Sequence, residues 1–349
     1  MKKLLLFILL SPLSLFATNY YISTTGNNIN NGLSTATPKA SLANVFSSFN
    51  LAADDTIFVA AGTYAEKGIV VGADDEGFVI QGAALDVSGV PTSIFDSDQT
   101  ATWLTFNWDN NDNITIDKIK VKDYKSNLNL PNGGGICVNA KDCIGLTVSN
   151  SYFDNCDAGN IGKGGAIFFF KLTGTTNTIN LLNNTFTNCN ADAGGGAVYI
   201  SHSTEIDLNI NKCKFFNNST SAFSGSVLYY DGSSGSVLTM TNSLVYKNTL
   251  SGNNHGTIYI GSAGCIANLM NCTIADNTAN TSYTGGVYFE SGGSTLINCI
   301  IYNNTYKDVY RSSGTINLKY CCYKTHLGCS PDVNSFTIDP GFKSPGTND

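Results

Sequence analysis

The chain has 349 residues, of which only 13% are charged, and 26 acidic against 19 basic residues give a formal net charge of −7. Phosphate binding needs a basic surface, and Arg311 is the only arginine, so we do not expect a nucleic-acid partner. The length is sufficient for a large core, and 35 glycines favour a fold that is rich in turns.

Residues 1–17 predict a secretory signal peptide. Lys2 and Lys3 precede an apolar run that starts at Leu4, and the small residue Ala17 follows it. A run of roughly 13 residues is too short to span a bilayer, and no later stretch is apolar enough to do so. We therefore expect a protein that is secreted or held on the outer surface of a bacterial cell, without a transmembrane segment.

Residues 18–66 predict an N-terminal cap that leads into a first coil. Within residues 38–50, Leu42, Val45, Phe46 and Phe49 have helical spacing, and residues 55–60 read as a strand. The end of a solenoid is an open apolar cross-section with unpaired strand edges, and an amphipathic helix can cover it. After this cap, residues 67–320 are expected to form the solenoid and residues 321–349 a C-terminal cap or tail.

A short pattern recurs seven times between residues 133 and 317, as GGGIC, GGAIF, GGAVY, GSVLY, HGTIY, TGGVY and SGTIN. The copies start at 133, 164, 195, 225, 255, 284 and 313, so the steps are 31, 31, 30, 30, 29 and 29 residues. A second pattern keeps the same period, from NSYFDNC at 150 to NCIIYNN at 298. Two motifs in phase at this period indicate a solenoid.

Each period contains three short β-rich runs, such as residues 197–200, 206–210 and 213–216, separated by turn residues. No helical periodicity occurs between them. The expected fold is therefore all-β, a parallel β-helix with about 30 residues per coil.

Alternation within the first run assigns its columns to the inside or the outside of the coil. The apolar columns through Val198 and Ile200 are expected to face the core. The column between them is expected to face outward, and it contains Cys137, Phe168, Tyr199, Tyr229, Tyr259, Tyr288 and Asn317. A flanking column of small residues is also expected to face outward and to leave the rings approachable, namely Ala166, Ala197, Val227, Thr257 and Gly286.

The five successive aromatics Phe168, Tyr199, Tyr229, Tyr259 and Tyr288 have two interpretations. They could form a platform on which sugar rings stack, or a ladder of self-stacked rings that stabilises the sheet. The column Asn218, Asn248, Asn277 and Asn304 is expected to be structural, with side-chain amides bonded along the stack.

Eleven cysteines in an exported chain suggest disulfides. Equivalent positions of neighbouring coils lie ~4.8 Å apart, within disulfide range, so Cys156 with Cys189 and Cys272 with Cys299 are geometrically allowed. Cys321 and Cys329 could staple the C-terminal cap together with Cys322. Cys213 is expected to be a buried thiol, and no metal site is expected.

The N-terminal segment, with TGNNINNG, a helix and DTIFVAAGTY, resembles secreted bacterial right-handed parallel β-helix proteins of the pectate-lyase-like superfamily. The repeats GGAI, GGAV and FFNN are similar to those of chlamydial polymorphic outer-membrane proteins. The resemblance implies a right-handed parallel β-helix that serves as a lyase, a hydrolase or an adhesin. For a lyase it implies a lysine base, here Lys118, Lys120 or Lys122 near Asp109, Asp112, Asp117 and Asp123, and acidic ligands for Ca²⁺.

We expect an alternating lysine stripe of this kind to be a solvated face. The leading hypothesis is therefore a non-catalytic surface or extracellular protein that contacts a glycan or adheres to a host or cell-surface component through a long strand face. No cofactor is expected for it. The alternative is a polysaccharide lyase or glycoside hydrolase.

Overall fold

The computed structural model describes residues 17–106, 113–126, 132–139, 145–171, 177–202, 204–252, 254–261, 264–291 and 293–342. The expected signal peptide, apart from Ala17, lies outside the described residues, as do Asp109, Asp112 and Cys143.

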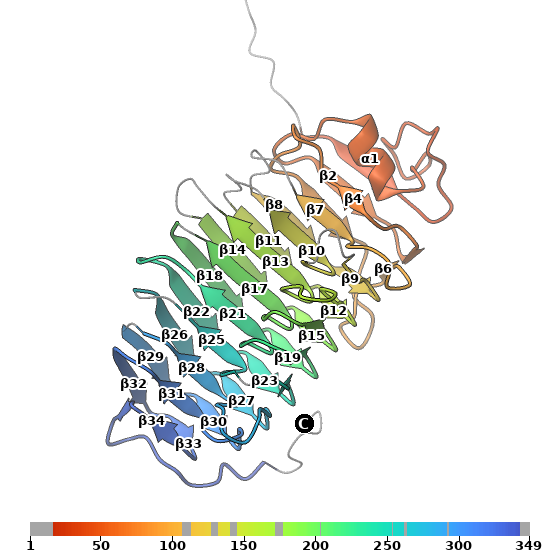
Figure 1. Cartoon of the computed structure of the whole chain (residues 1–349). Coiled ribbons are helices and arrows are strands. Elements are labelled where there is room, and N and C mark those ends of the chain that lie inside the picture. The colour runs from red at the N-terminus through yellow and green to blue at the C-terminus, as the bar shows by residue number, and fades with distance from the viewer. Residues whose placement is uncertain are drawn as a thin grey trace, which may run out of the picture.

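The chain forms a parallel β-helix in which successive coils stack along one axis (Figure 1). Three sheets run along this axis, and we call them A, B and C. A coil contributes one short strand to sheet C, then one to sheet A and one to sheet B, and each strand pairs in parallel with its equivalent in the next coil. Val198 lies opposite Ile167 on one side and Leu228 on the other, so the expected period of about 30 residues is confirmed.

Sheet A has twelve strands: β1 (Asn19–Ile22), β2 (Thr56–Val59), β5 (Val79–Gly82), β8 (Ile114–Asp117), β11 (Gly145–Ser149), β14 (Asn177–Leu182), β18 (Ile206–Asn211), β22 (Val237–Thr241), β26 (Ile266–Met270), β29 (Gly293–Ile297), β32 (Thr315–Lys319) and β35 (Ser330–Pro331). Sheet B has ten: β3 (Gly62–Tyr64), β6 (Ser93–Asp96), β9 (Ile119–Lys122), β12 (Tyr152–Asp154), β15 (Thr185–Thr187), β19 (Lys214–Phe216), β23 (Leu244–Tyr246), β27 (Thr273–Ala275), β30 (Ile300–Tyr302) and β33 (Cys322–Tyr323).

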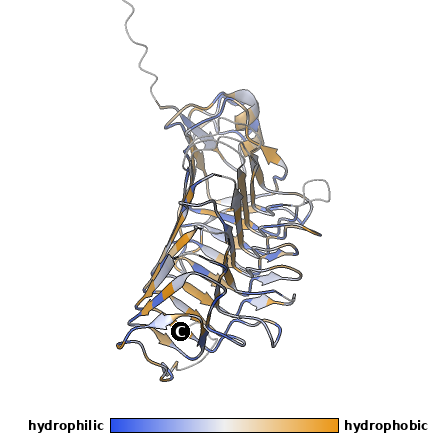
Figure 2. Cartoon of the chain, turned by 60° about the vertical axis from the view of Figure 1, so that its left-hand side comes forward, coloured by the Kyte–Doolittle hydropathy of each residue, from blue (hydrophilic) through white to orange (hydrophobic). Residues whose placement is uncertain are grey.

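Sheet C also has ten strands: β4 (Ile69–Val70), β7 (Leu104–Phe106), β10 (Ile136–Asn139), β13 (Ile167–Lys171), β17 (Val198–His202), β21 (Leu228–Asp231), β25 (Ile258–Ile260), β28 (Val287–Phe289), β31 (Val309–Arg311) and β34 (His326–Leu327). A short fourth sheet joins β16 (Asn190–Ala191), β20 (Ser219–Thr220) and β24 (Thr249–Leu250). In Figure 2 loops project from one side of the stacked coils.

The corner between sheets A and B explains the second sequence repeat. Asn150, Asn183 and Asn242 each occupy it with φ between 47° and 55°, a left-handed conformation that asparagine tolerates better than most residues. Two residues form the corner, and the strand of sheet B starts two positions after the asparagine. The phenylalanine of the motif then faces inward, as Phe153, Phe186 and Phe215 do.

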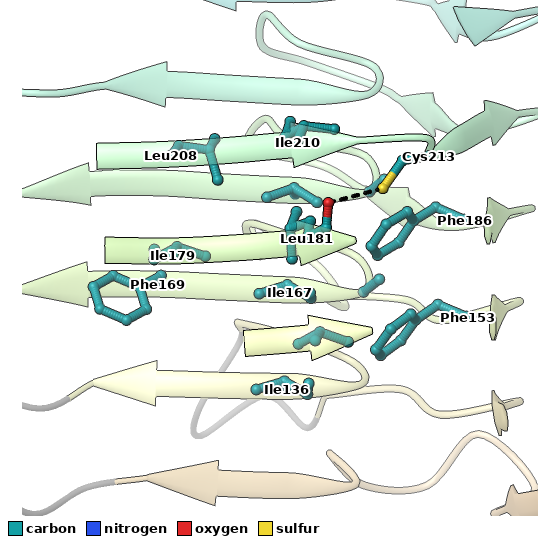
Figure 3. Packing of buried hydrophobic residues seen from close by; sticks show 14 of the residues in the cluster. Ile136, Phe153, Ile167, Phe169, Ile179, Leu181, Phe186, Leu208, Ile210 and Cys213 are labelled. Carbon is teal, nitrogen blue, oxygen red and sulfur yellow. Dashed lines mark hydrogen bonds between the residues drawn. The ribbon is translucent and has the colours of Figure 1, made fainter. Parts of the chain in front are cut away.

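The core consists of the inward side chains of the three sheets, stacked coil upon coil (Figure 3). The inward column of sheet C is at most 1% exposed from Ile136 to Val287, as predicted. Phe186 stacks between Phe153 and Phe215 with ring centroids 5.0 and 4.9 Å away. Cys213 is a buried thiol, as expected, and donates to the Leu181 carbonyl oxygen at 3.2 Å.

Two expectations about sheet C were wrong, and the first concerns the small flanking column. Ala166, Ala197 and Val227 belong to the core instead of the outer face. A bulge at the start of each strand accounts for this: the Ala197 carbonyl oxygen accepts from the amides of both Ala166 and Ile167, at 2.9 and 3.0 Å. The bulge turns two successive residues inward, which strict alternation does not allow.

The second wrong expectation concerns the seventh repeat. SGTIN lies in β32 of sheet A, whereas the strand that follows β28 in sheet C is β31, with Tyr310 opposite Tyr288. The cause is a shorter loop, because ten positions separate Asn277 from Val287 but only five separate Asn304 from Val309. Asn317 is therefore no part of the aromatic column.

Helix α1 (Leu42–Ser48) lies at the N-terminal end of the solenoid (Figure 1). Ser41 caps it by accepting from the Asn44 amide, and Glu66 accepts from the amides of Leu42 and Ala43. Phe46 packs on Phe78 of the solenoid with ring centroids 5.3 Å apart, so the helix covers the first coils as expected of a cap. In the described ranges no helix is long and apolar enough to cross a membrane.

Candidate functional site

The outward column of sheet C forms a continuous stack of aromatic rings. Phe168 of β13, Tyr199 of β17, Tyr229 of β21, Tyr259 of β25 and Tyr288 of β28 stand in register. Their successive ring centroids lie 5.7, 4.7, 4.7 and 5.4 Å apart, with interplanar angles of 5–19°. The ladder interpretation of these rings therefore describes their arrangement.

Tyr310 of β31 adds a sixth ring, with its centroid 5.1 Å from that of Tyr288. The constant repeat period of the sequence did not predict it. His255 joins the same end of the ladder. Its imidazole stacks on Tyr288 at 4.7 Å, and its Nδ1 accepts from the Thr284 amide at 3.3 Å. Burial lowers the pKa of His255, so the stacked imidazole is mainly neutral near pH 7.

Stacking decides which part of each ring a ligand can reach. The faces of Tyr199, Tyr229, Tyr259 and Tyr288 are each covered by the neighbouring rings, so a sugar cannot lie flat on any of them. What remains for a ligand is the outer edge, with a row of phenol hydroxyl groups. A platform for face-to-face sugar stacking is therefore the wrong chemistry for the middle of this ladder.

The two halves of the ladder differ in exposure. Phe168 and Tyr199 are only 5% exposed and form a small hydrophobic cluster with Cys137, and Lys163 lies 4.9 Å from the Tyr199 ring centroid. From Tyr229 to Tyr310 the rings are half-buried. We call Tyr229, Tyr259, Tyr288 and Tyr310 the tyrosine strip, because only these edges are open to a ligand.

A second outward row runs beside the strip, two positions after each ladder tyrosine. Asp231, Gly261, Glu290 and Ser312 occupy it in register, because the backbone bonds Gly261 N to Tyr230 O, Glu290 N to Ile260 O and Ser312 N to Phe289 O continue the ladder. Two carboxylates thus share one sheet face with a glycine between them. Sequence reasoning missed this pair, although the signal was present at the second position after Tyr229 and Tyr288.

Glu290 contacts Tyr259, and Asp231 lies beside Gly261. The Tyr259 hydroxyl group donates to Glu290 Oε2. A Cβ placed on Gly261 would come within 2.9 Å of Asp231 Oδ1 and 3.0 Å of Tyr259 Cε1, so the missing side chain leaves space into which Asp231 leans. Burial first, and then the hydrogen bond to Glu290, raise the pKa of Tyr259, which keeps its phenol protonated.

The lysine stripe lies on another sheet and is neutralised there. Lys120 and Lys122 stand on the outer face of β9 in sheet B, and Lys122 lies 2.6 Å from Asp123 and 3.1 Å from Asp96. Lys120 lies 3.6 Å from Asp154. The contacts with Asp123 and Asp96 raise the pKa of Lys122, which is the opposite of what a general base needs.

Lys118 occupies the corner before β9 and lies 3.4 Å from Asp117, which also accepts from Ser149 and Asn150. In the described part of the chain, no group of three or more His, Cys, Asp or Glu side chains could hold a metal ion.

Six of the ten described cysteines occupy two inward corner columns. Cys156 and Cys189 follow sheet B, and burial followed by contact with the Cys189 thiol raises the pKa of Cys156. Cys272, Cys299 and Cys321 follow sheet A, and contacts with the Cys272 and Cys321 thiols raise the pKa of Cys299. Cys321 thus lies beside Cys299, while Cys329 lies at the other end of the last coil, between β34 and β35.

All ten described cysteines are free thiols in the structure, and the disulfides stay predictions. The asparagine column Asn218, Asn248, Asn277 and Asn304 is bonded along the stack as expected, with each Nδ2 donating to the next Oδ1 at 2.8–3.0 Å. Buried Asp308 ends the column by accepting from Asn304 Nδ2 at 2.9 Å.

Comparison with known proteins supports the fold and goes no further. No protein-family model matches the chain, and no curated protein matches it. Among solved structures it is similar to the pectate lyase Pel9A, with a TM-score of 0.52 and 14% sequence identity over 93% of this chain and 80% of that chain. A rhamnogalacturonan lyase also matches, with a TM-score of 0.39 and 14% identity over 93% and 86% of the two chains. The chain has the parallel β-helix fold of pectate lyase.

Proposed function

We propose that this chain is a non-catalytic glycan-binding protein that works outside the cell and contacts a polysaccharide along the tyrosine strip of sheet C. The observation that carries the proposal is the in-register row of tyrosines, whose faces are covered by neighbouring rings and whose side chains are half-buried on the outer face of sheet C. Phenol hydroxyl groups can donate to and accept from sugar hydroxyls. Because the row follows the solenoid axis, a bound polymer would lie along that axis.

A lyase has less support than binding. The three candidate lysines are ion-paired, and Lys120 and Lys122 stand on sheet B, away from the strip on sheet C. The likeness to pectate lyase Pel9A, at 14% identity, supports the fold, and a polysaccharide as the class of ligand is part of our proposal.

Hydrolysis is a second candidate because of Asp231 and Glu290. They stand two strands apart, about 9.6 Å at the backbone, and Asp231 leans toward Glu290 over Gly261. Inverting glycosidases place their two carboxyl groups roughly 6.5–9.5 Å apart. A reducing-end assay on the polymers that bind, with Asp231→Asn as the inactive control, separates cleavage from binding.

The test of binding removes the hydroxyl groups while it keeps the stack. We expect the triple variant Tyr229→Phe, Tyr259→Phe and Tyr288→Phe to lose at least about tenfold in affinity for the best ligand of a glycan array, at an unchanged circular dichroism spectrum. The matched control is Tyr302→Phe on the outer face of sheet B. Unchanged binding by the triple variant would refute the strip as the contact surface.

A further inference from the structure

The charges around the tyrosine strip restrict which polysaccharide it can hold. The strip is bordered by Asp231, which lies beside Gly261, and by Glu290, which accepts from the Tyr259 hydroxyl group. Glu290 is exposed and Asp231 is half-buried. A polymer lying on the strip would therefore pass within hydrogen-bonding reach of two carboxylates.

The cationic groups that the structure describes near the ladder cannot offset these charges. Lys163 lies over Tyr199, at the buried end beyond the strip. Arg311 follows Tyr310, and it stands opposite Phe289 of the inward column instead of in the outward column of the strip. The strip is thus locally acidic, in a chain whose net charge is already −7.

Carboxylates favour one kind of sugar over another. An ionised carboxylate has two oxygens that only accept hydrogen bonds, and sugar hydroxyl groups are donors that can satisfy them. A uronate or sulfate group placed at the same point would instead bring two negative charges together at short range, which is unfavourable.

We infer that the strip selects an uncharged polysaccharide, whose hydroxyl groups donate to Asp231 and Glu290, and rejects polyuronates. This rests on the proposed function, because it names the class of glycan that the same surface binds. Gly261 belongs to the recognition because a side chain there would come within 2.9 Å of Asp231 Oδ1 and displace this carboxylate. Gly261 lies outside the left-handed region, so alanine fits its backbone without strain.

The experiment compares dextran, galactan and xylan with polygalacturonate, by affinity electrophoresis and calorimetry at low and high salt. We expect the wild-type protein to bind at least one neutral polymer at least about tenfold more tightly than polygalacturonate at low salt. Salt should reduce the difference, because it screens the repulsion at this exposed site. Tighter binding of polygalacturonate than of every neutral polymer would overturn the inference.

Three variants test the residues. Asp231→Asn with Glu290→Gln keeps the shapes and removes both charges, so we expect weaker neutral binding and a gain for polygalacturonate. Gly261→Ala keeps both charges but displaces Asp231, so neutral binding should fall without that gain. Asp207→Asn, on the outer face of β18 in sheet A, is the control for the loss of one charge. It should change neither the binding of neutral polymers nor the binding of polygalacturonate.

The two proposals fail in different ways. If the tyrosine-to-phenylalanine variant loses binding while the Asp231 and Glu290 variant leaves the preference unchanged, only the neutral-glycan inference is refuted. If the wild-type protein binds none of the four polymers and nothing on the glycan array, the proposed function is refuted and the inference with it. Circular dichroism and the melting temperature of each variant show that the β-helix is retained.

Discussion

Truncating two rings of the ladder should cost far more stability than an exposed tyrosine normally does. The double variant Tyr229→Ala and Tyr259→Ala breaks three stacked pairs, with centroid distances of 4.7, 4.7 and 5.4 Å. Such pairs contribute roughly 0.5–1.5 kcal/mol each, so we expect a loss of about 1.5–4.5 kcal/mol from the pairs alone. The two half-buried rings add a further hydrophobic loss.

The assay is urea unfolding followed by circular dichroism, with Tyr302→Ala, which removes an outward ring of sheet B, as the control. A drop in the free energy of unfolding of less than about 0.5 kcal/mol beyond the control would refute the stacking argument, because one intact pair is already worth that much. Since a solenoid loses stability locally, unfolding should begin in the coils that carry β21 and β25. Hydrogen exchange of those strands can detect this.

Three further predictions concern the interior. Val198→Asp should prevent folding, since its carboxylate would lie without a partner in a fully buried column; soluble, folded variant protein would contradict this. Burial raises the pKa of Asp308, so its carboxyl group keeps its proton to higher pH in the folded state than in the unfolded state. The free energy of unfolding should therefore fall as pH rises from about 4 through the folded pKa. Urea titrations at several pH values should show this slope, and Asp308→Asn should remove it. Under oxidising conditions mass spectrometry should find Cys299 joined to Cys272 or to Cys321 but never to both, and Cys299→Ser should abolish both links; no such link in the oxidised wild-type protein would contradict this.

The period and the alternation of the sequence were enough to predict the three sheets and their register. Residues such as Val198 and Phe186 repeat at the spacing of a coil, and parallel in-register pairing makes equivalent positions neighbours. The asparagine column was predictable for the same reason, because Asn248 stands between two equivalent amides. At these positions the repeating side chains of the sequence agree with the observed strand pairing.

The errors arose where the coil departs from a strict repeat. Ala197 turns inward because of a backbone bulge. Small residues allow such a bulge, but their presence in the sequence does not predict it. Tyr310 was missed because a shortened loop brings its strand early, so a constant period pointed to Asn317 instead. The pair Asp231 and Glu290 was missed because it occurs in only two coils, and a search for columns favours residues that recur in all of them.

Under the proposed function, the covered ring faces and the acidic border together favour the binding of a neutral polymer. Rings that stack at 4.7 Å are held by their neighbours, so the hydroxyl row of the strip is fixed at the spacing of the strands. A rigid row of donors and acceptors loses little conformational entropy when a polymer is bound. The phenols of Tyr229, Tyr259 and Tyr288 stay protonated, since burial raises their pKa. A neutral glycan would therefore meet the same set of phenol groups over the physiological pH range, and only the two carboxylates beside Gly261 would distinguish it from a charged one.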